Sequence, residues 1–222
     1  MSMNTVQTTR SEFSAEDALR SYRAAAAVLS SFRSAALRPL ELRYQDNGGT
    51  MLDLLEECER VVLDDGELRW MLKNSVRRQT LRELGTPAAI RRALEANTPR
   101  PDDALQRMFE ACIAGSAPHL ADQTLEELTA TLQVRDWLEG TLPGLPPRVE
   151  LIDRLEWSHL LEPFRRLVGP YFQGRQRELQ DLHDYVFAAR ATRTIYQARP
   201  LMVYGAGGIG KSTLLAKFIL DS

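Results

Sequence analysis

The residues best suited to do chemistry lie in the stretch 201–220, which reads LMVY, GAGGIGKS and TLLAKFIL. Gly205, Gly210, Lys211 and Ser212 fit G-x-x-x-x-G-K-[ST], the pattern of a phosphate-binding loop (P-loop). Glycines let such a loop curl until its backbone N–H groups point inward at an anion. Lys211 would then reach the β- and γ-phosphates of a nucleotide, and the Ser212 hydroxyl would be a ligand of Mg²⁺. An ordinary glycine-rich turn is the alternative, but the spacing and the flanking patterns favour phosphate binding.

Two elements must position this loop. The sequence predicts a strand over 201–204 and a helix that begins near Lys211, whose positive N-terminal end adds to the anion site. A doubly wound P-loop domain needs a sheet of about five parallel strands, and only one is predicted here. We therefore expect residues 169–222 to be the incomplete start of such a domain, and the chain to be the N-terminal fragment of a longer protein.

The residues before this region predict an all-helical domain over 14–168, after a flexible N-terminus at 1–13. The first helix has Ser14 as its N-cap and extends to about Leu37. No alternation typical of a strand occurs before residue 200. The predicted fold is therefore mainly α, a multi-helix N-terminal bundle followed by the first helix, strand and P-loop of a truncated α/β domain. The other predicted helices span about 50–65, 67–84, 86–96, 103–114, 124–140 and 148–167, the last with a break near Pro163, and a further helix follows Gly174.

Composition excludes several classes of function. The net charge of −2 provides no basic surface for nucleic acid, so we expect no nucleic-acid partner. No apolar stretch near the N-terminus is long enough for a signal peptide or a membrane span, which predicts a cytoplasmic protein without membrane contact. Cys58 and Cys112 lie in apolar patterns without metal-ligand spacing, and we expect both to be free thiols.

Other chemically capable residues have simpler interpretations. The histidines are scattered, the acidic residues near Glu56 predict a solvated helix face, and the tryptophans predict core anchors rather than an exposed partner surface. The paired arginines predict solvated faces rather than a stripe that follows a phosphate backbone. These residues are His119, His159 and His183; Glu56, Glu57, Glu59, Asp64 and Asp65; Trp70, Trp137 and Trp157; and Arg77–Arg78, Arg91–Arg92 and Arg165–Arg166.

A second motif precedes the loop by about 30 residues. Phe172-Gln-Gly174-Arg175, followed by Glu178-Leu179, resembles the start of the ATPase module in STAND-class and related AAA+ proteins. The form GGIGKS resembles the NB-ARC and NACHT branches more than the origin-recognition ATPases. The resemblance covers about 171–222, and its P-loop is the specific part.

The resemblance implies ATP or ADP with Mg²⁺ as the cofactor of the complete parent protein. It implies phosphate contacts at Gly207, Gly208, Ile209, Gly210 and Lys211, Mg²⁺ at Ser212, Thr213 near the α-phosphate, and Phe172, Gly174 and Arg175 beside the base. No acidic residue of a Walker B strand follows, so we expect no ATP hydrolysis by this chain alone.

The leading hypothesis is therefore the N-terminal part of an ATP-binding regulatory switch, of a kind that includes bacterial antiviral defence proteins. The family implies that the helical domain binds a protein effector or adaptor and that the full-length parent forms homo-oligomers. Two alternatives stay open: a helical interaction module with a non-functional P-loop remnant, and an AAA+ ATPase acting on DNA.

Overall fold

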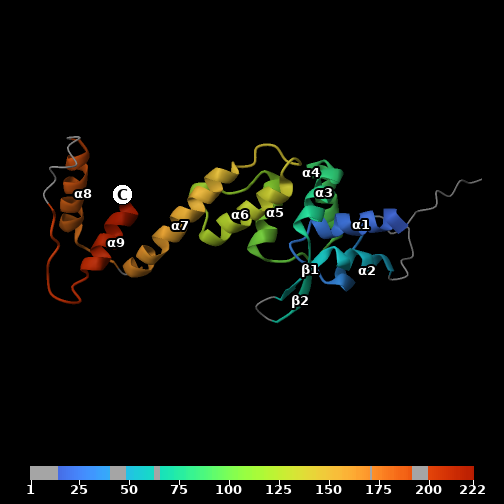
Figure 1. Cartoon of the computed structure of the whole chain (residues 1–222), viewed down its shortest axis with the longest axis horizontal. Helices are drawn as coiled ribbons and strands as arrows, with labels where there is room; N and C mark the ends of the chain where they lie inside the picture. Colours follow the sequence, from blue (N-terminus) through green and yellow to red (C-terminus); the bar gives the residue numbers. More distant parts are fainter. Residues whose placement is uncertain (1–14, 41–48, 63–65, 171, 192–199) are drawn as a thin grey trace, which may run out of the picture. The chain divides into compact units, whose positions relative to one another are not determined.

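The computed structural model describes residues 15–40, 49–62, 66–170, 172–191 and 200–222, and in these the chain is mainly helical (Figure 1). The chain divides into two compact units, 1–152 and 153–222, and the division falls inside a helix. The domain boundary predicted from the sequence lies later, between residues 168 and 169. The predicted N-cap Ser14 and the predicted flexible N-terminus lie outside the described residues.

The helices follow one another with a single hairpin among them. In chain order the described elements are α1 (Ala15–Ala27), the 3₁₀ turn η1 (Ser34–Ala36), α2 (Gly49–Glu56), β1 (Cys58–Val62), β2 (Leu68–Leu72), α3 (Asn74–Leu84), α4 (Pro87–Ala96), α5 (Ala104–Ala114), η2 (Leu120–Asp122), α6 (Leu125–Leu138), α7 (Arg148–Val168), α8 (Gln176–Ala191) and α9 (Lys211–Asp221).

Three helices begin where the sequence predicts a helix start, and each has a capping side chain there. Thr86 accepts a hydrogen bond from the Ala89 N–H at 3.2 Å to start α4, with Pro87 in its first turn. Asp103 caps α5, and Thr124 forms a complete capping box with Glu127 at the start of α6. These side chains satisfy N–H groups that have no partner within the helix, which is why sequence alone locates these helix starts.

Helix α1 ends at Ala27, well before the predicted end near Leu37, so the prediction of a long first helix is wrong. The fully buried Arg77 of α3 donates to the carbonyl oxygens of Ala27 at 3.0 Å, Leu29 at 2.6 Å and Ser30 at 3.4 Å. Gln106 of α5 donates to the Val28 carbonyl at 3.2 Å and accepts from the Ser30 N–H at 2.7 Å. The side chains of Arg77 and Gln106 thus bind the backbone groups that would otherwise form helical hydrogen bonds after Ala27. These tertiary contacts outweigh the high helix propensity of the alanine-rich segment.

Arg77 also corrects the prediction that the arginine pairs lie on solvated faces. Its guanidinium lies 3.9 Å from the ring centre of Trp137, and burial lowers its pKa to about 9, which still leaves it charged at neutral pH. The prediction holds for Arg91 and Arg92, which are exposed on α4.

The predicted helices over 50–65 and 67–84 are wrong in part, because a hairpin lies where they were expected to meet. Strands β1 and β2 pair antiparallel with Cys58 opposite Leu72 and Val62 opposite Leu68. Trp70 of β2 also pairs with Phe32 through two backbone hydrogen bonds of 2.8 Å. The strands read CERVV and LRWML, and such short apolar runs do not distinguish a strand from a buried helical turn by their periodicity.

The acidic residues near Glu56 consequently do not share one solvated helix face. Glu57 follows α2 and pairs with Arg23 of α1 at 2.6 Å, whereas Glu59 is an exposed residue of β1. Asp64 and Asp65 lie outside the described residues. Within those residues, no group of three or more His, Cys, Asp or Glu side chains is placed to hold a metal ion.

The core of the first unit lies where α1, α3, α5 and α6 pack together, with β2 contributing Leu72. Its largest fully buried side chains include Trp137, Phe109, Leu54, Leu81, Ile90 and Leu138. Phe109 and Trp137 meet edge to face, with ring centres 6.2 Å apart. The prediction of a core tryptophan is thus confirmed for Trp137, while Trp70 is half-buried beneath the Arg60 guanidinium on the hairpin.

Both cysteines are free thiols, as expected, with Cys58 buried and Cys112 half-buried. Burial raises the pKa of Cys58 to about 11 and raises that of Cys112. We expect the contribution of Cys58 to the free energy of unfolding to fall as the pH rises from about 9 to about 11, because this thiol ionises first in the unfolded chain. Urea unfolding across this range checks it, because the original chain should lose more stability with rising pH than Cys58→Ala does. An equally steep dependence in Cys58→Ala would contradict the assignment to this thiol.

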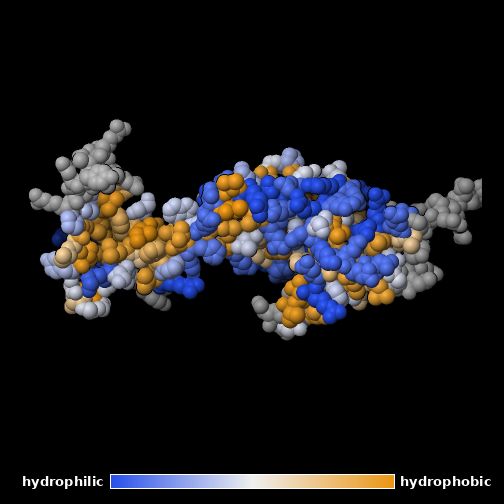
Figure 2. Space-filling model, in the orientation of Figure 1, coloured by the Kyte–Doolittle hydropathy of each residue, from blue (hydrophilic) through white to orange (hydrophobic). Residues whose placement is uncertain are grey.

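Helix α7 departs from its prediction in two ways. It continues through Pro163 without the expected break, and Trp157 is 64% exposed, so the prediction of a core tryptophan is wrong there. Leu160 and Leu167 are also exposed, and Figure 2 shows hydrophobic residues on this part of the surface. No helix among the described residues combines the length and the apolar character needed to cross a membrane.

In the second unit, α8 and α9 contact each other. The predicted strand over 201–204 does not form in the structure, and Leu201, Met202 and Tyr204 are exposed. A β-strand is stabilised by backbone hydrogen bonds to a neighbouring strand. Among the described residues, no strand pairs with this segment. Helix α9 begins at Lys211, as predicted.

Candidate functional site

The candidate site is the segment from Gly205 to Ser212, where an exposed loop runs into α9. Gly210 precedes the helix in the left-handed conformation (φ 84°, ψ 30°), and its carbonyl oxygen accepts the first helical hydrogen bond, from the Leu214 N–H at 2.9 Å. Leu214 and Ala216 are buried and hold α9 in its unit. The loop is thereby fixed at one end by a packed helix and stays open to solvent along its length.

Glycine is required at particular loop positions. Gly208 (φ 78°) and Gly210 adopt a backbone conformation that side chains with a Cβ disfavour. At Gly205 an added Cβ would lie 3.2 Å from Ile209 Cγ2, so the loop closes on itself there. At Gly207, Gly208 and Gly210 an added Cβ would meet no atom within 4 Å. Here the backbone is open to the close approach of a ligand.

Lys211 folds back over this loop. Its Nζ donates hydrogen bonds to the carbonyl oxygens of Gly205 at 2.9 Å and Ala206 at 3.0 Å. The ammonium group therefore lies at the loop backbone rather than extended into solvent. A phosphate group is a stronger acceptor than a carbonyl because it is charged. Lys211 is thus placed where an incoming phosphate could exchange with these two carbonyl groups.

Arg175 joins the Gly-Arg segment to the loop. It is the one described non-glycine residue with a positive φ (59°), and its carbonyl oxygen accepts from the Leu179 N–H in the first turn of α8. Its guanidinium donates a hydrogen bond to the carbonyl oxygen of Ile209. The two motifs singled out in the sequence thus touch, although they lie far apart along the chain.

The structure brings together only part of the predicted site. Lys211, Gly205, Ile209 and Arg175 are connected by contacts, whereas no side-chain hydrogen bond of the described residues joins Ser212 or Thr213 to the loop. Phe172 is half-buried, while Gly174 (φ 75°) and Gly207 are exposed, and their predicted roles beside the base and at the phosphates stay predictions. The side-chain hydrogen bond from Arg175 to the loop was not predicted, because the two partners are distant in sequence.

The electrostatic character of the segment suits an anion. Between Pro200 and Leu220 the sequence contains no acidic residue, and the loop is contacted by the cations Lys211 and Arg175. The N-terminus of α9 adds a partial positive charge and N–H groups without helical partners. The residues present therefore fit a phosphate group, and the Ser212 hydroxyl is an oxygen ligand of the kind that Mg²⁺ accepts.

Comparison with known proteins does not assign this site. No protein-family model, no curated protein and no solved structure matches the chain. The resemblance to STAND-class and AAA+ ATPases accordingly stays a prediction based on the two motifs.

Proposed function

We propose that the loop from Gly205 to Ser212 binds the phosphates of ATP or ADP. The observation that carries the proposal is the position of the Lys211 ammonium group on the loop carbonyls, at the first residue of α9. A lysine held there reaches a phosphate with a small change of its side-chain torsions. The open backbone at Gly207 and Gly208 supports the proposal, because phosphates approach such loops closely.

Each residue of the site would have its own role in nucleotide binding. Lys211 exchanges its two carbonyl partners for phosphate oxygens, and the N–H groups from Gly207 to Lys211 donate to the phosphates. Ser212 would hold Mg²⁺, which screens the phosphate charge when bound. Arg175 positions the loop through the Ile209 carbonyl group. No described residue is assigned to position an attacking water, so the proposal is binding and not hydrolysis.

In a wider sense, we propose that the chain is part of an ATP-binding regulatory switch in the cytoplasm, whose helical first unit binds a protein partner. Bacterial antiviral defence is one setting that the resemblance suggests. Support comes from the juxtaposition of the Gly-Arg segment with the P-loop pattern in the second unit. The alternatives, a non-functional P-loop remnant and an ATPase acting on DNA, are outcomes of the tests below.

The test is a titration of the full chain with a fluorescent ATP analogue in the presence of Mg²⁺. Lys211→Ala should weaken binding by about 10- to 100-fold, because it removes charge-assisted hydrogen bonds to phosphate. Lys217→Ala is the matched control on the same helix. Lys217 pairs with Asp221 at 2.7 Å and is not part of the loop. The affinity of Lys217→Ala for the ATP analogue should therefore stay within about twofold of that of the original chain.

Two results would reject nucleotide binding. One is the absence of binding by the original chain at millimolar nucleotide, which would favour the remnant. The other is equal affinity of Lys211→Ala and Lys217→Ala, which would mean that the analogue binds elsewhere.

A further inference from the structure

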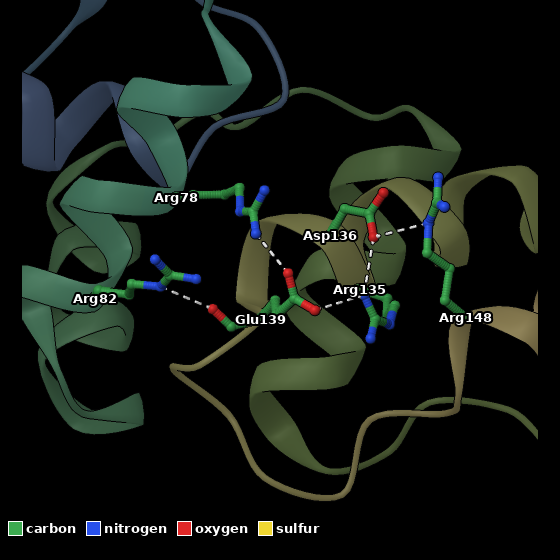
Figure 3. A network of polar contacts seen from close by, with 6 residues as sticks. All are labelled: Arg78, Arg82, Arg135, Asp136, Glu139 and Arg148. Carbon is green, nitrogen blue, oxygen red and sulfur yellow. Dashed lines mark hydrogen bonds and ion pairs between the residues drawn. The ribbon is translucent and has the colours of Figure 1, made fainter.

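Four arginines of the first unit gather around two carboxylates on one side of the helical bundle. We call this set the arginine cluster: Arg78 and Arg82 on α3, Arg135, Asp136 and Glu139 at the end of α6, and Arg148 at the start of α7. Figure 3 shows Arg78 and Arg82 pointing from α3 toward Glu139, with Arg135 and Arg148 around Asp136.

The Glu139 residue is bound from three sides. Its Oε2 accepts from Arg78 at 2.5 Å, its Oε1 accepts from Arg135 at 3.1 Å, and its backbone carbonyl oxygen accepts from Arg82 Nε at 3.0 Å. Each side-chain oxygen thus has its own guanidinium partner. Among the described residues, the Arg82 guanidinium donates to the neutral backbone carbonyl group of Glu139 and to neither of its carboxylate oxygens.

Asp136 is shared in the same way. Its Oδ1 accepts from Arg135 at 3.0 Å and lies 3.6 Å from Arg148 Nε. Counting charges within the cluster, four guanidinium groups minus two carboxylates leave an excess of two positive charges. The Arg135 side chain is only 18% exposed, and its buried Nε has no hydrogen-bond partner. The cluster therefore has more donors and more positive charge than its own acceptors satisfy.

A hollow beside the cluster offers space for a ligand. It has a volume of about 640 Å³ and lies along α3. Its lining residues are Ser75, Arg78, Gln79, Arg82 and Glu83. Arg82 is exposed and the Arg78 side chain is 37% exposed, so both guanidinium groups can be reached from solvent.

We propose that the arginine cluster binds an acidic segment of a partner protein, whose carboxylates accept hydrogen bonds from Arg78 and Arg82. The proposal rests on the proposed role of the helical unit as the partner-binding part. The cluster already binds carboxylates within the chain, because Asp136 and Glu139 each lie between two guanidinium groups. Arginine forks match carboxylate geometry, and charge complementarity selects and steers such a partner.

An acidic protein segment fits better than nucleic acid. Nucleic acid is bound along an extended basic stripe, and affinity grows with the number of phosphates contacted. The cluster is local, with Glu83 lining the same hollow, and the whole chain carries a net charge of −2. A few carboxylates on a protein partner match an excess of two charges more closely than a phosphate backbone does.

The cluster also connects α3 to the end of α6, which is a structural role, and the experiment must separate the two roles. The probe is a fluorescently labelled oligoglutamate peptide, titrated with the full chain at low salt and followed by fluorescence anisotropy. The double substitution Arg78→Gln and Arg82→Gln should weaken binding about tenfold. Raising the salt from about 50 to about 200 mM should weaken binding by the original chain, since exposed charges are screened.

The controls come from the same bundle. Arg91→Gln with Arg92→Gln removes the same charge from exposed positions of α4 and should change the affinity less than about twofold. Glu83→Gln removes the acid that lines the hollow, and binding should tighten about two- to threefold. A loss of binding caused only by misfolding could not produce this gain. Lys211→Ala should bind oligoglutamate as the original chain does, which separates this proposal from nucleotide binding.

The proposal is overturned by any of four results. The first is that the original chain does not bind oligoglutamate at low salt, and the second is that it binds oligoglutamine equally well. The third is that the Arg91 and Arg92 variant loses as much affinity as the cluster variant. The fourth is that single-stranded DNA binds more tightly than oligoglutamate and loses its affinity in the cluster variant. The last result would make the cluster a nucleic-acid site. If the double variant does not fold, Arg82→Gln and Glu83→Gln decide through opposite shifts in affinity.

Discussion

Arg77→Ala is expected to reduce the free energy of unfolding by about 3–5 kcal/mol, the largest loss we predict for a charged residue. Arg77 is fully buried and donates to the carbonyl oxygens of Ala27, the last residue of α1, and of Leu29 and Ser30 just beyond it. Each buried acceptor left without a partner costs about 1–3 kcal/mol, and the removed side chain leaves a cavity against Trp137. The substitution also removes a buried charge, which is itself unfavourable. The expected loss of stability is therefore smaller than the summed costs of the unpaired acceptors and the cavity.

Urea unfolding at neutral pH measures the effect, and Arg92→Ala is the matched control. Arg92 is exposed on α4, and its loss should change stability by less than about 0.5 kcal/mol. Arg77→Met retains much of the buried volume but cannot donate to the carbonyl groups. If Arg77→Met were as stable as the original chain, the hydrogen bonds to Ala27, Leu29 and Ser30 would contribute nothing net, and our explanation of where α1 ends would fail.

The same residue shows why the end of α1 was not predicted from the sequence, although several helix starts were. A capping side chain such as Asp103 or Thr124 lies next to the N–H groups that it satisfies, so its signature is local in sequence. The end of α1 depends on Arg77 and Gln106, which come from other helices. No pattern within the alanine-rich segment could reveal those partners.

The hairpin was missed for a related reason. Strands β1 and β2 are short, and β2 is stabilised further by its pairing with Phe32, which lies far away in sequence. A few apolar residues fit helical and strand periodicity equally well, and the outcome depends on the neighbour that completes the hydrogen-bond ladder. Gly66 (φ 80°) lies between the strands, where the sequence predicts a break between two helices.

The candidate site was predictable in its parts and not in its connections. The glycine pattern located the loop and the start of α9 at Lys211, because both depend on local backbone chemistry. The hydrogen bond from Arg175 to Ile209 depends on the packing of α8 against α9. The arginine cluster likewise assembles residues of three helices, and in sequence those residues show only as separate basic residues.

The tryptophans allow a sharp test of the first unit's core. Trp137→Ala is expected to cost about 3–5 kcal/mol of stability, since Trp137 is only 1% exposed. The substitution removes the edge-to-face contact with Phe109, the surface under the Arg77 guanidinium, and the hydrogen bond from Nε1 to Asn74 Oδ1 at 2.8 Å. Trp137→Phe should cost less, because an aromatic ring remains while the hydrogen bond at the start of α3 is lost.

Trp157→Ala is the matched control, because both tryptophans fit the same helical apolar pattern in sequence. Trp157 is 64% exposed, so its loss should change stability by less than about 0.5 kcal/mol in urea unfolding. A cost comparable to that of Trp137→Ala would show that the α7 surface is covered in solution. Because Arg77 and Trp137 are in contact, the double variant Arg77→Ala with Trp137→Ala should cost less than the sum of the two single losses. Strict additivity would mean that the guanidinium and the ring contribute independently.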